Sequence, residues 1–159
     1  MRFWLPDYEL AHFREITPEM LRDAGIRGLM VDLDNTIAPW RKELSSEAEE
    51  WFACMRGAGI QTCLLSNSRH PTRAQRIADD LGIFCVAWAK KPRRGGYERA
   101  RKEMKLERRE VAIVGDQIFT DILGGKRAGV KTILVTPLPG GELPILRILR
   151  FLERVVGRK

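Results

Sequence analysis

The chain has 159 residues, of which 44% are hydrophobic, so it can form one domain with its own core and is not a wholly disordered chain. No apolar run approaches the roughly 20 residues that span a bilayer, and the first ten residues do not have the pattern of a signal peptide. The net charge of +7 indicates an anionic partner, which can be a phosphorylated substrate, nucleic acid or an acidic membrane surface.

The cysteines indicate the redox environment of the protein. Cys54, Cys63 and Cys85 are odd in number and do not have the spacing of a metal site. Each lies among apolar residues, so we expect buried, reduced thiols in a cytoplasmic protein.

The N-terminal segment, residues 1–26, is expected to dock on the rest of the protein or on a membrane, because residues 1–16 are too apolar for a free tail. Within it, Thr17 and Pro18 have the pattern of a helix start, and Gly25 has that of a helix end.

Strand and helix patterns then alternate through residues 27–136. Short apolar runs predict strands at 27–32, 61–65, 83–88, 110–114 and 130–135, and helical spacing predicts helices at 45–56, 71–81, 97–105 and 120–128. This alternation predicts an α/β, Rossmann-like three-layer sandwich with a mainly parallel sheet of five strands. We expect a single domain, with 27–136 as its core.

The C-terminal segment, residues 143–159, has the pattern of an amphipathic helix with an apolar face and an arginine-rich face. Such a helix can pack on the sheet with its basic face in solvent, or it can lie on an anionic membrane surface.

Polar residues follow four of the predicted strands directly. In a parallel sheet the carboxyl ends of the strands share one edge, where ligands bind. These residues are Asp32 and Asp34, Ser66, Lys91, and Asp116 with Asp121 beyond it. We therefore expect them to form one site.

These residue types suit the hydrolysis of a phosphate ester. Asp32, Asp116 and a backbone carbonyl near Asp34 can hold Mg²⁺, which prefers oxygen ligands. Lys91 and the Ser66 hydroxyl can bind phosphate oxygens. One carboxylate of the Asp32–Asp34 pair can attack phosphorus, and the other can transfer protons.

The same residues can also have purely structural roles. Asp32 and Asp34 can form a solvated acidic turn, and Ser66 can be only a turn residue. Lys90 competes with Lys91 for the phosphate, and Asp121 can be only a helix cap.

Four ordered motifs resemble the haloacid dehalogenase (HAD) superfamily of phosphatases. The motifs are residues 32–36 (Asp-Leu-Asp-Asn-Thr), 64–67 (Leu-Leu-Ser-Asn), 91–92 (Lys-Pro) and 115–121 (Gly-Asp-Gln-Ile-Phe-Thr-Asp).

The resemblance implies a role for each matching residue. The implied roles are nucleophile for Asp32, general acid/base for Asp34, phosphate binding for Ser66, Asn67 and Lys91, Mg²⁺ binding for Asp32, Asp34 and Asp116, and support for Thr36 and Asp121.

The first and fourth motifs, together with residues 3–7 and 16–18, are similar to the YqeG-type subclass IIIA group, which is related to mitochondrial phosphatidylglycerophosphate phosphatases. The intervals between the motifs are too short for a separate cap domain, so we expect an open site. The predicted substrate is phosphatidylglycerophosphate or a similarly exposed phosphate.

Two alternative functions and several partner questions remain. The first alternative is a soluble phosphatase for nucleic acid ends or a small ester, and the less favoured one is a non-enzymatic binding module. Arginines near the third motif can bind a second phosphate or remain in solvent; they are Arg93, Arg94, Arg99 and Arg101. Peripheral membrane contact is compatible with the sequence, nucleic acid is the less favoured partner, and the oligomeric state is not defined.

Overall fold

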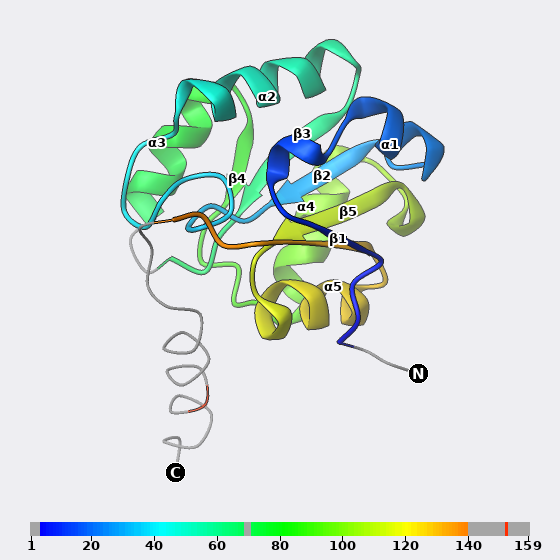
Figure 1. Cartoon of the computed structure of the whole chain (residues 1–159). Helices are drawn as coiled ribbons and strands as arrows, with labels where there is room; N and C mark the ends of the chain where they lie inside the picture. The colour runs from blue at the N-terminus through cyan, green and yellow to red at the C-terminus, as the bar shows by residue number, and fades with distance from the viewer. Residues whose placement is uncertain (1–3, 69–70, 140–151, 153–159) are drawn as a thin grey trace.

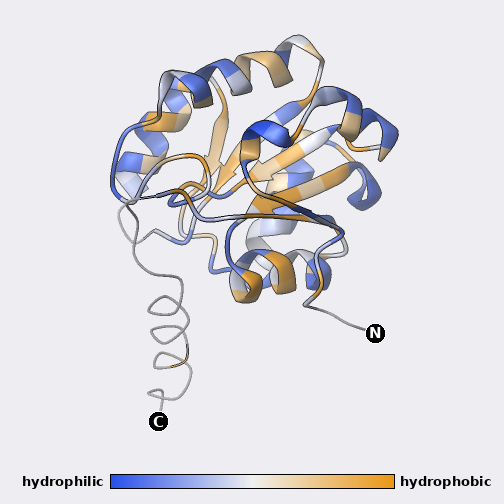
Figure 2. Cartoon of the chain, viewed as in Figure 1, coloured by the Kyte–Doolittle hydropathy of each residue, from blue (hydrophilic) through white to orange (hydrophobic). Residues whose placement is uncertain are grey.

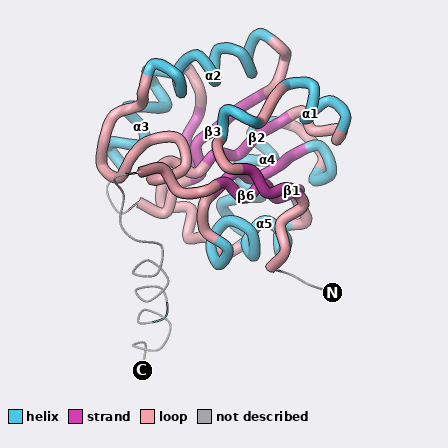
Figure 3. The backbone as a smooth tube through the Cα atoms, viewed as in Figure 1, coloured by secondary structure: helices cyan, strands magenta, loops and turns pink. Residues whose placement is uncertain are grey.

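The computed structural model describes residues 4–68, 71–139 and 152, which form an α/β fold around one sheet (Figures 1 and 3). The strands lie in the order β1-β6-β5-β2-β3-β4, and each neighbouring pair is parallel. Their bounds are Tyr8–Leu10 (β1), Gly28–Val31 (β2), Gln61–Leu65 (β3), Phe84–Val86 (β4), Val111–Gly115 (β5) and Lys131–Val135 (β6).

Helices connect these strands. The α-helices are Pro18–Asp23 (α1), Ser46–Gly57 (α2), Pro71–Leu81 (α3), Arg94–Met104 (α4) and Leu123–Ala128 (α5), with short turns at Phe13–Glu15 (η1), Arg108–Glu110 (η2) and Ile118–Ile122 (η3). Two predicted helix starts are capped as their sequences require, because Thr17 Oγ1 accepts from Met20 N at 3.2 Å and Ser45 Oγ accepts from Ala48 N at 3.2 Å.

Successive side chains of the buried strands point to opposite faces of the sheet, so helices pack on both faces and the fold has three layers. In β2, Leu29 and Val31 pack into the same core cluster as residues of α1, α2 and α3, whereas Met30 packs on the other face with residues of α4. Figure 2 shows the strands as predominantly hydrophobic and the helices as mixed, which is the pattern of a sheet covered on both faces. The predicted α/β fold with a parallel sheet is confirmed.

The strand count is a correction, because the sheet has six strands where the sequence predicts five. The additional strand is β1, which pairs with β6 in the register Tyr8↔Ile133 and Leu10↔Val135. It was missed because it has only three residues, among them an exposed glutamate, and therefore gives no strand-length apolar pattern.

Three smaller differences from the sequence predictions concern the end of β4, the start of α4 and the burial of the cysteines. β4 ends at Val86 rather than at residue 88, since Trp88 takes a left-handed conformation with φ of 55° that interrupts a strand. α4 begins at Arg94 instead of residue 97. Of the three cysteines expected to be buried, only Cys63 is; Cys85 is half-buried, and Cys54 is exposed because it lies on the outer side of α2, opposite the face that buries Trp51 and Phe52.

The intervals after the first two motifs contain little besides connecting loops and one helix each. α2 lies between β2 and β3, and α3 lies between β3 and β4, so the described residues include no separate cap domain. None of the described helices has the length and hydropathy needed to cross a bilayer. The predicted C-terminal helix falls outside the described residues, apart from Leu152.

Asp7 attaches the N-terminal segment to β6. Its Oδ2 accepts from the Thr132 backbone N–H at 2.9 Å and from the Thr132 hydroxyl at 3.1 Å, while Lys126 Nζ donates to Oδ1 at 2.7 Å. Burial alone would raise the pKa of Asp7, but the hydrogen bonds from Lys126 and Thr132 outweigh it and lower the pKa below 3.8.

Asp7→Asn is expected to lower the free energy of unfolding by about 1 kcal/mol at pH 7, a modest figure because the group is partly exposed. Since the pKa of Asp7 is depressed in the fold, this contribution is present above the unfolded pKa and is lost as the pH falls through the folded one. Urea unfolding at pH 7 and near pH 3 measures it. The control is Glu9→Gln on the exposed side of β1; equal losses in the two variants at pH 7 would contradict the assignment.

Candidate active site

The site forms at the carboxyl edge of the central strands. Asp32 directly follows β2, where its backbone N–H donates to Val114 O of β5 at 2.9 Å. Asp116 directly follows β5, Ser66 directly follows β3, and Lys91 lies in the loop after β4. The parallel arrangement therefore brings residues from distant parts of the sequence to one edge.

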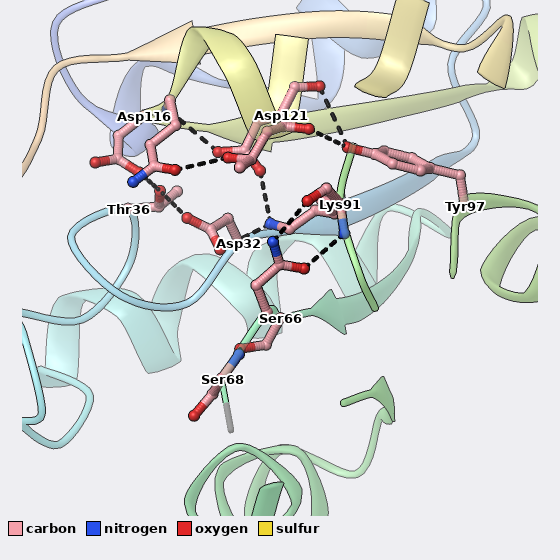
Figure 4. A network of polar contacts seen from close by, with 11 residues as sticks. Asp32, Thr36, Ser66, Ser68, Lys91, Tyr97, Asp116 and Asp121 are labelled. Carbon is pink, nitrogen blue, oxygen red and sulfur yellow. Dashed lines mark hydrogen bonds and ion pairs between the residues drawn. The ribbon is translucent and has the colours of Figure 1, made fainter. Parts of the chain in front are cut away.

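Lys91 is the centre of a buried network of charges (Figure 4). Its Nζ lies 3.0 Å from Asp32 Oδ1 and 2.6 Å from Asp121 Oδ1, and its side chain is 2% exposed. Burial would lower the pKa of this lysine, but the carboxylates of Asp121 and Asp32 outweigh burial and raise it. Lys91 is therefore kept as a charged ammonium group at neutral pH, at the edge of the sheet.

Asn67 fixes the backbone of Lys91. The Lys91 N–H donates to Asn67 Oδ1 at 2.7 Å, and Asn67 Nδ2 donates to the Lys91 carbonyl at 2.9 Å. The neighbouring Lys90 is exposed. Of the two lysines that the sequence left open, Lys91 is the one in the network, and its orientation is set by an asparagine from the preceding motif.

Asp121 is fully buried beneath the edge of the sheet. Its Oδ2 accepts from the Gln117 backbone N–H at 3.2 Å, while Oδ1 pairs with Lys91. Burial and the nearby Asp32 raise the pKa of Asp121, Lys91 and the Gln117 N–H oppose this, and the net result is a pKa of about 6. Asp121 is more than a helix cap, because one carboxylate oxygen bonds the start of its helical turn while the other pairs with Lys91 inside the protein.

Tyr97, from α4, supports the turn that carries Asp121. Its hydroxyl donates to the Thr120 carbonyl at 2.7 Å, and its ring packs so closely on Gly124 that a Cβ there would lie 2.4 Å from the phenol oxygen. Sequence reasoning did not select Tyr97. The available signal was a single aromatic residue on a helix that is otherwise rich in charge.

Thr36 joins the two carboxylates at the other side of the network. Its Oγ1 lies 3.2 Å from Asp32 Oδ2 and 3.2 Å from Asp116 Oδ1, so the hydroxyl can donate to either of them. Thr36 is buried, which fixes the spacing of the two acids.

Three carboxylates meet within reach of one cation. One oxygen each from Asp32, Asp116 and Asp121 lie within 4.8 Å of one another. All three donors are hard oxygen ligands, which fit Mg²⁺ better than a soft transition metal. The residues present therefore fit a divalent cation, although Asp121 rather than the side chain of Asp34 is the third member.

Asp34 is not a member of this group of three carboxylates. Its Oδ1 lies 2.8 Å from Arg73 Nη1 of α3 and accepts from the Arg41 backbone N–H at 3.3 Å. The sequence analysis predicts that a backbone carbonyl near Asp34 is a ligand of the cation, and this stays a prediction. Arg73 was not selected from the sequence, where it is one of several charged residues on the outer side of a helix.

Ser66 is buried at the end of β3, as the second motif requires. Its Oγ accepts from the Ser68 backbone N–H at 3.1 Å, which is the bond of a turn residue. The hydroxyl hydrogen is not used in that bond. Ser66 can therefore be a turn residue and a phosphate-binding residue at once, since its hydroxyl oxygen accepts the turn bond and its hydrogen remains able to donate to a phosphate oxygen.

Comparison with known families shows which family the chain belongs to. The profile of the haloacid dehalogenase-like hydrolases matches residues 6–129, which include all four motifs and the network described above. The chain is a haloacid dehalogenase-like hydrolase. The resemblance predicted from the four motifs is confirmed.

Relatives of this hydrolase are phosphatases by name. It is 36% identical to the probable phosphatase YqeG of Bacillus subtilis over 96% of this chain and 89% of the relative. It is 31% identical to phosphatidylglycerophosphate phosphatase 1 of Arabidopsis thaliana over 96% of this chain, but it spans only 47% of that protein's length. These relatives confirm the predicted enzyme class, a phosphatase of the HAD family.

A solved structure shares the fold of this hydrolase. The cobalt-bound form of the deoxy-D-mannose-octulosonate 8-phosphate phosphatase from Haemophilus influenzae superposes with a TM-score of 0.54 over 85% of this chain and 91% of that one, at 16% identity. This similarity supports the fold assignment alone.

Gly115→Ala tests how tightly Asp121 is packed. A Cβ at this position would lie 2.1 Å from Asp121 Oδ2, so the carboxylate must move and the Lys91 pair must loosen. We expect the free energy of unfolding to fall by about 1–3 kcal/mol, measured by urea unfolding. Gly57→Ala is the control, because a Cβ there meets nothing within 4 Å. Unchanged stability of Gly115→Ala would show that the site tolerates a displaced Asp121.

Proposed function

We propose that this hydrolase is a Mg²⁺-dependent phosphomonoester hydrolase that works through an aspartyl-phosphate intermediate. The observation that carries the proposal is the buried Lys91 ammonium beside Asp32, with the oxygens of Asp116 and Asp121 close by. Charged groups concentrated at a strand edge are unfavourable for stability alone, because each is removed from water. Their arrangement fits the binding of one cation and one phosphoryl group.

Asp32, Asp116 and Asp121 would hold the cation, with the backbone near Asp34 as a further ligand. When bound, the ion supplies positive charge that offsets the phosphate dianion and lets a carboxylate approach phosphorus. The Lys91 ammonium supplies a second positive charge for the phosphate, and the hydroxyl of Ser66 donates to a phosphate oxygen. Asn67 keeps Lys91 in position for this contact.

The reaction has two balanced steps. A carboxylate oxygen of Asp32 attacks phosphorus, the bond from phosphorus to the ester oxygen breaks, and protonated Asp34 gives its proton to the leaving alcohol. A water molecule then attacks phosphorus, Asp34 takes one of its protons, and the bond to Asp32 breaks. Inorganic phosphate is released, and both aspartates return to their starting forms.

Phosphatidylglycerophosphate, or a similarly exposed phosphate, is the substrate class that we propose. Two observations besides the Arabidopsis relative support it. The described residues include no cap domain that would enclose a small molecule. In addition, exposed apolar side chains occupy the two loops that meet at the Lys91–Asp121 pair: Trp88 is 47%, Ile118 42% and Phe119 37% exposed.

These loops would contact a lipid surface beside the site. Large apolar side chains favour insertion among lipids, and the exposed Lys90, Arg93 and Arg94 favour an anionic surface. The same cations would also favour a nucleic acid end or a small anionic ester, so a soluble substrate is the alternative that the assay below must exclude.

Asp32→Asn is expected to lower phosphatase kcat by about 1000-fold or more, because an amide cannot act as the nucleophile. Turnover of p-nitrophenyl phosphate is measured with Mg²⁺ and again with EDTA, which should abolish the wild-type rate. Asp23→Asn is the control for loss of a carboxylate, since Asp23 is exposed at the end of α1. Wild-type activity in Asp32→Asn, or in EDTA, would refute the mechanism.

The substrate is tested with lipid, nucleotide, oligonucleotide 3′-phosphate and sugar phosphates side by side. We expect the highest kcat/KM on phosphatidylglycerophosphate in anionic vesicles. The double variant Trp88→Ser with Ile118→Ser should lower this kcat/KM by about 10-fold, because it removes the apolar side chains that contact the lipid surface. It should leave p-nitrophenyl phosphate turnover unchanged, because that substrate needs no lipid contact. Trp4→Ser is the control, an exposed tryptophan elsewhere. Preference for a soluble ester, with no effect of the double variant, would favour the alternative.

A further inference from the structure

Arg73 connects the acid/base candidate to the helix that covers it. The residue lies in the first turn of α3, and its Nη1 is 2.8 Å from Asp34 Oδ1. Its Nη2 donates to the backbone carbonyl of Lys42, which belongs to the loop that follows the first motif. The Arg73 side chain thus holds both the candidate acid/base Asp34 and the loop that follows the first motif.

The bonds to Asp34 are all made to one of its two oxygens. Among the described contacts, Arg73 Nη1 and the Arg41 backbone N–H both donate to Oδ1, and none involves Oδ2. A carboxyl group held in this way cannot rotate freely, so the position of Oδ2 is fixed. The oxygen left over is the one that can carry a proton to or from a reacting group.

The Arg73–Asp34 ion pair is also less exposed to water than a neighbouring ion pair of α3. The side chains of Arg73 and Asp34 are 21% and 18% exposed, whereas a second arginine on the same helix, Arg76, pairs with Glu43 at 49% and 66% exposure. Both arginines attach α3 to the same loop, but only Arg73 contacts the first motif. Arg76 therefore provides a matched control.

The way Arg73 is held is not what stability alone would favour. Its Nε is buried and has no hydrogen-bond partner, an arrangement that typically costs about 1–3 kcal/mol. The guanidinium fork is needed to reach Asp34 and the Lys42 carbonyl at once, which an ammonium cannot do with the same geometry.

We infer that Arg73 is a positioning residue for proton transfer: by anchoring Asp34 Oδ1, it aims Oδ2 at the ester oxygen of the substrate. This inference rests on the proposed role of Asp34 as general acid/base. In the first step the proton leaves Oδ2 for the departing alkoxide as its bond to phosphorus breaks. In the second step Oδ2 accepts a proton from the attacking water.

Substrates with different leaving groups distinguish a role of Arg73 in proton transfer from a purely structural role. An alkoxide needs a proton as it departs, whereas p-nitrophenolate is stable without one. kcat/KM reports the steps up to the departure of the leaving group, so it isolates proton donation. A misaligned Asp34 lowers kcat/KM for an alkyl phosphate selectively, while damage to the fold lowers both values together.

The experiment compares Arg73→Met with the wild type on p-nitrophenyl phosphate and on the alkyl phosphate that has the highest kcat/KM in the screen above. General acid catalysis contributes about 100- to 10,000-fold, so we expect the alkyl kcat/KM to fall by roughly 10-fold or more and the aryl value by no more than about 2-fold. Because both substrates are assayed on one preparation, their ratio does not depend on the fraction of folded enzyme. Arg76→Met should leave the ratio unchanged.

Asp34→Asn distinguishes failure of this inference from failure of the proposed function. If Asp34 is the acid, Asp34→Asn lowers the alkyl-to-aryl ratio, and adding Arg73→Met lowers it no further, because both act on one proton transfer. A lowered ratio in Asp34→Asn with a wild-type ratio in Arg73→Met would overturn the inference and leave the function standing. A wild-type ratio in Asp34→Asn would refute the role of Asp34 itself.

Discussion

The ion pairs of Lys91 are the constraint on which the rest of the site depends. Removing an ammonium from water is unfavourable by several kcal/mol, and this is offset only when carboxylates surround it with good geometry. Asp32 at 3.0 Å and Asp121 at 2.6 Å meet that requirement. Loss of either carboxylate would leave a buried charge poorly compensated, so the positions of both are restricted by the lysine as much as by any catalytic need.

The restriction extends into the surrounding packing. Asn67 holds the lysine backbone, and Tyr97 holds the turn that presents Asp121. Gly115 is required where it stands because the Asp121 carboxylate occupies the space of its missing side chain. Residues that look unrelated in the sequence thus serve one buried network, which only the parallel sheet brings together.

The first motif is divided between two environments. Asp32 faces the lysine and the other acids, while Asp34 faces α3 and Arg73. Two carboxylates that are two residues apart in the sequence thus have different partners, and the different roles that we propose for them depend on this separation. Exposed apolar and cationic residues, among them Trp88 and Arg93, lie in the loop that contains Lys91, and our proposal of a phosphate presented at a surface depends on them.

The sequence by itself determined the α/β class, the order of most elements and the family, because apolar periodicity and short motifs are local properties of the chain. It also selected Asp32 and Asp116, since polar residues directly after buried strands have few structural explanations, and it left Lys90 and Lys91 as competing candidates. Only the tertiary structure placed Lys91, and not Lys90, in the buried network, added β1 to the sheet and brought Tyr97 and Arg73 to the site. Those outcomes depend on contacts between residues far apart in the chain, such as the 39 positions between Asp34 and Arg73, and no local pattern records them.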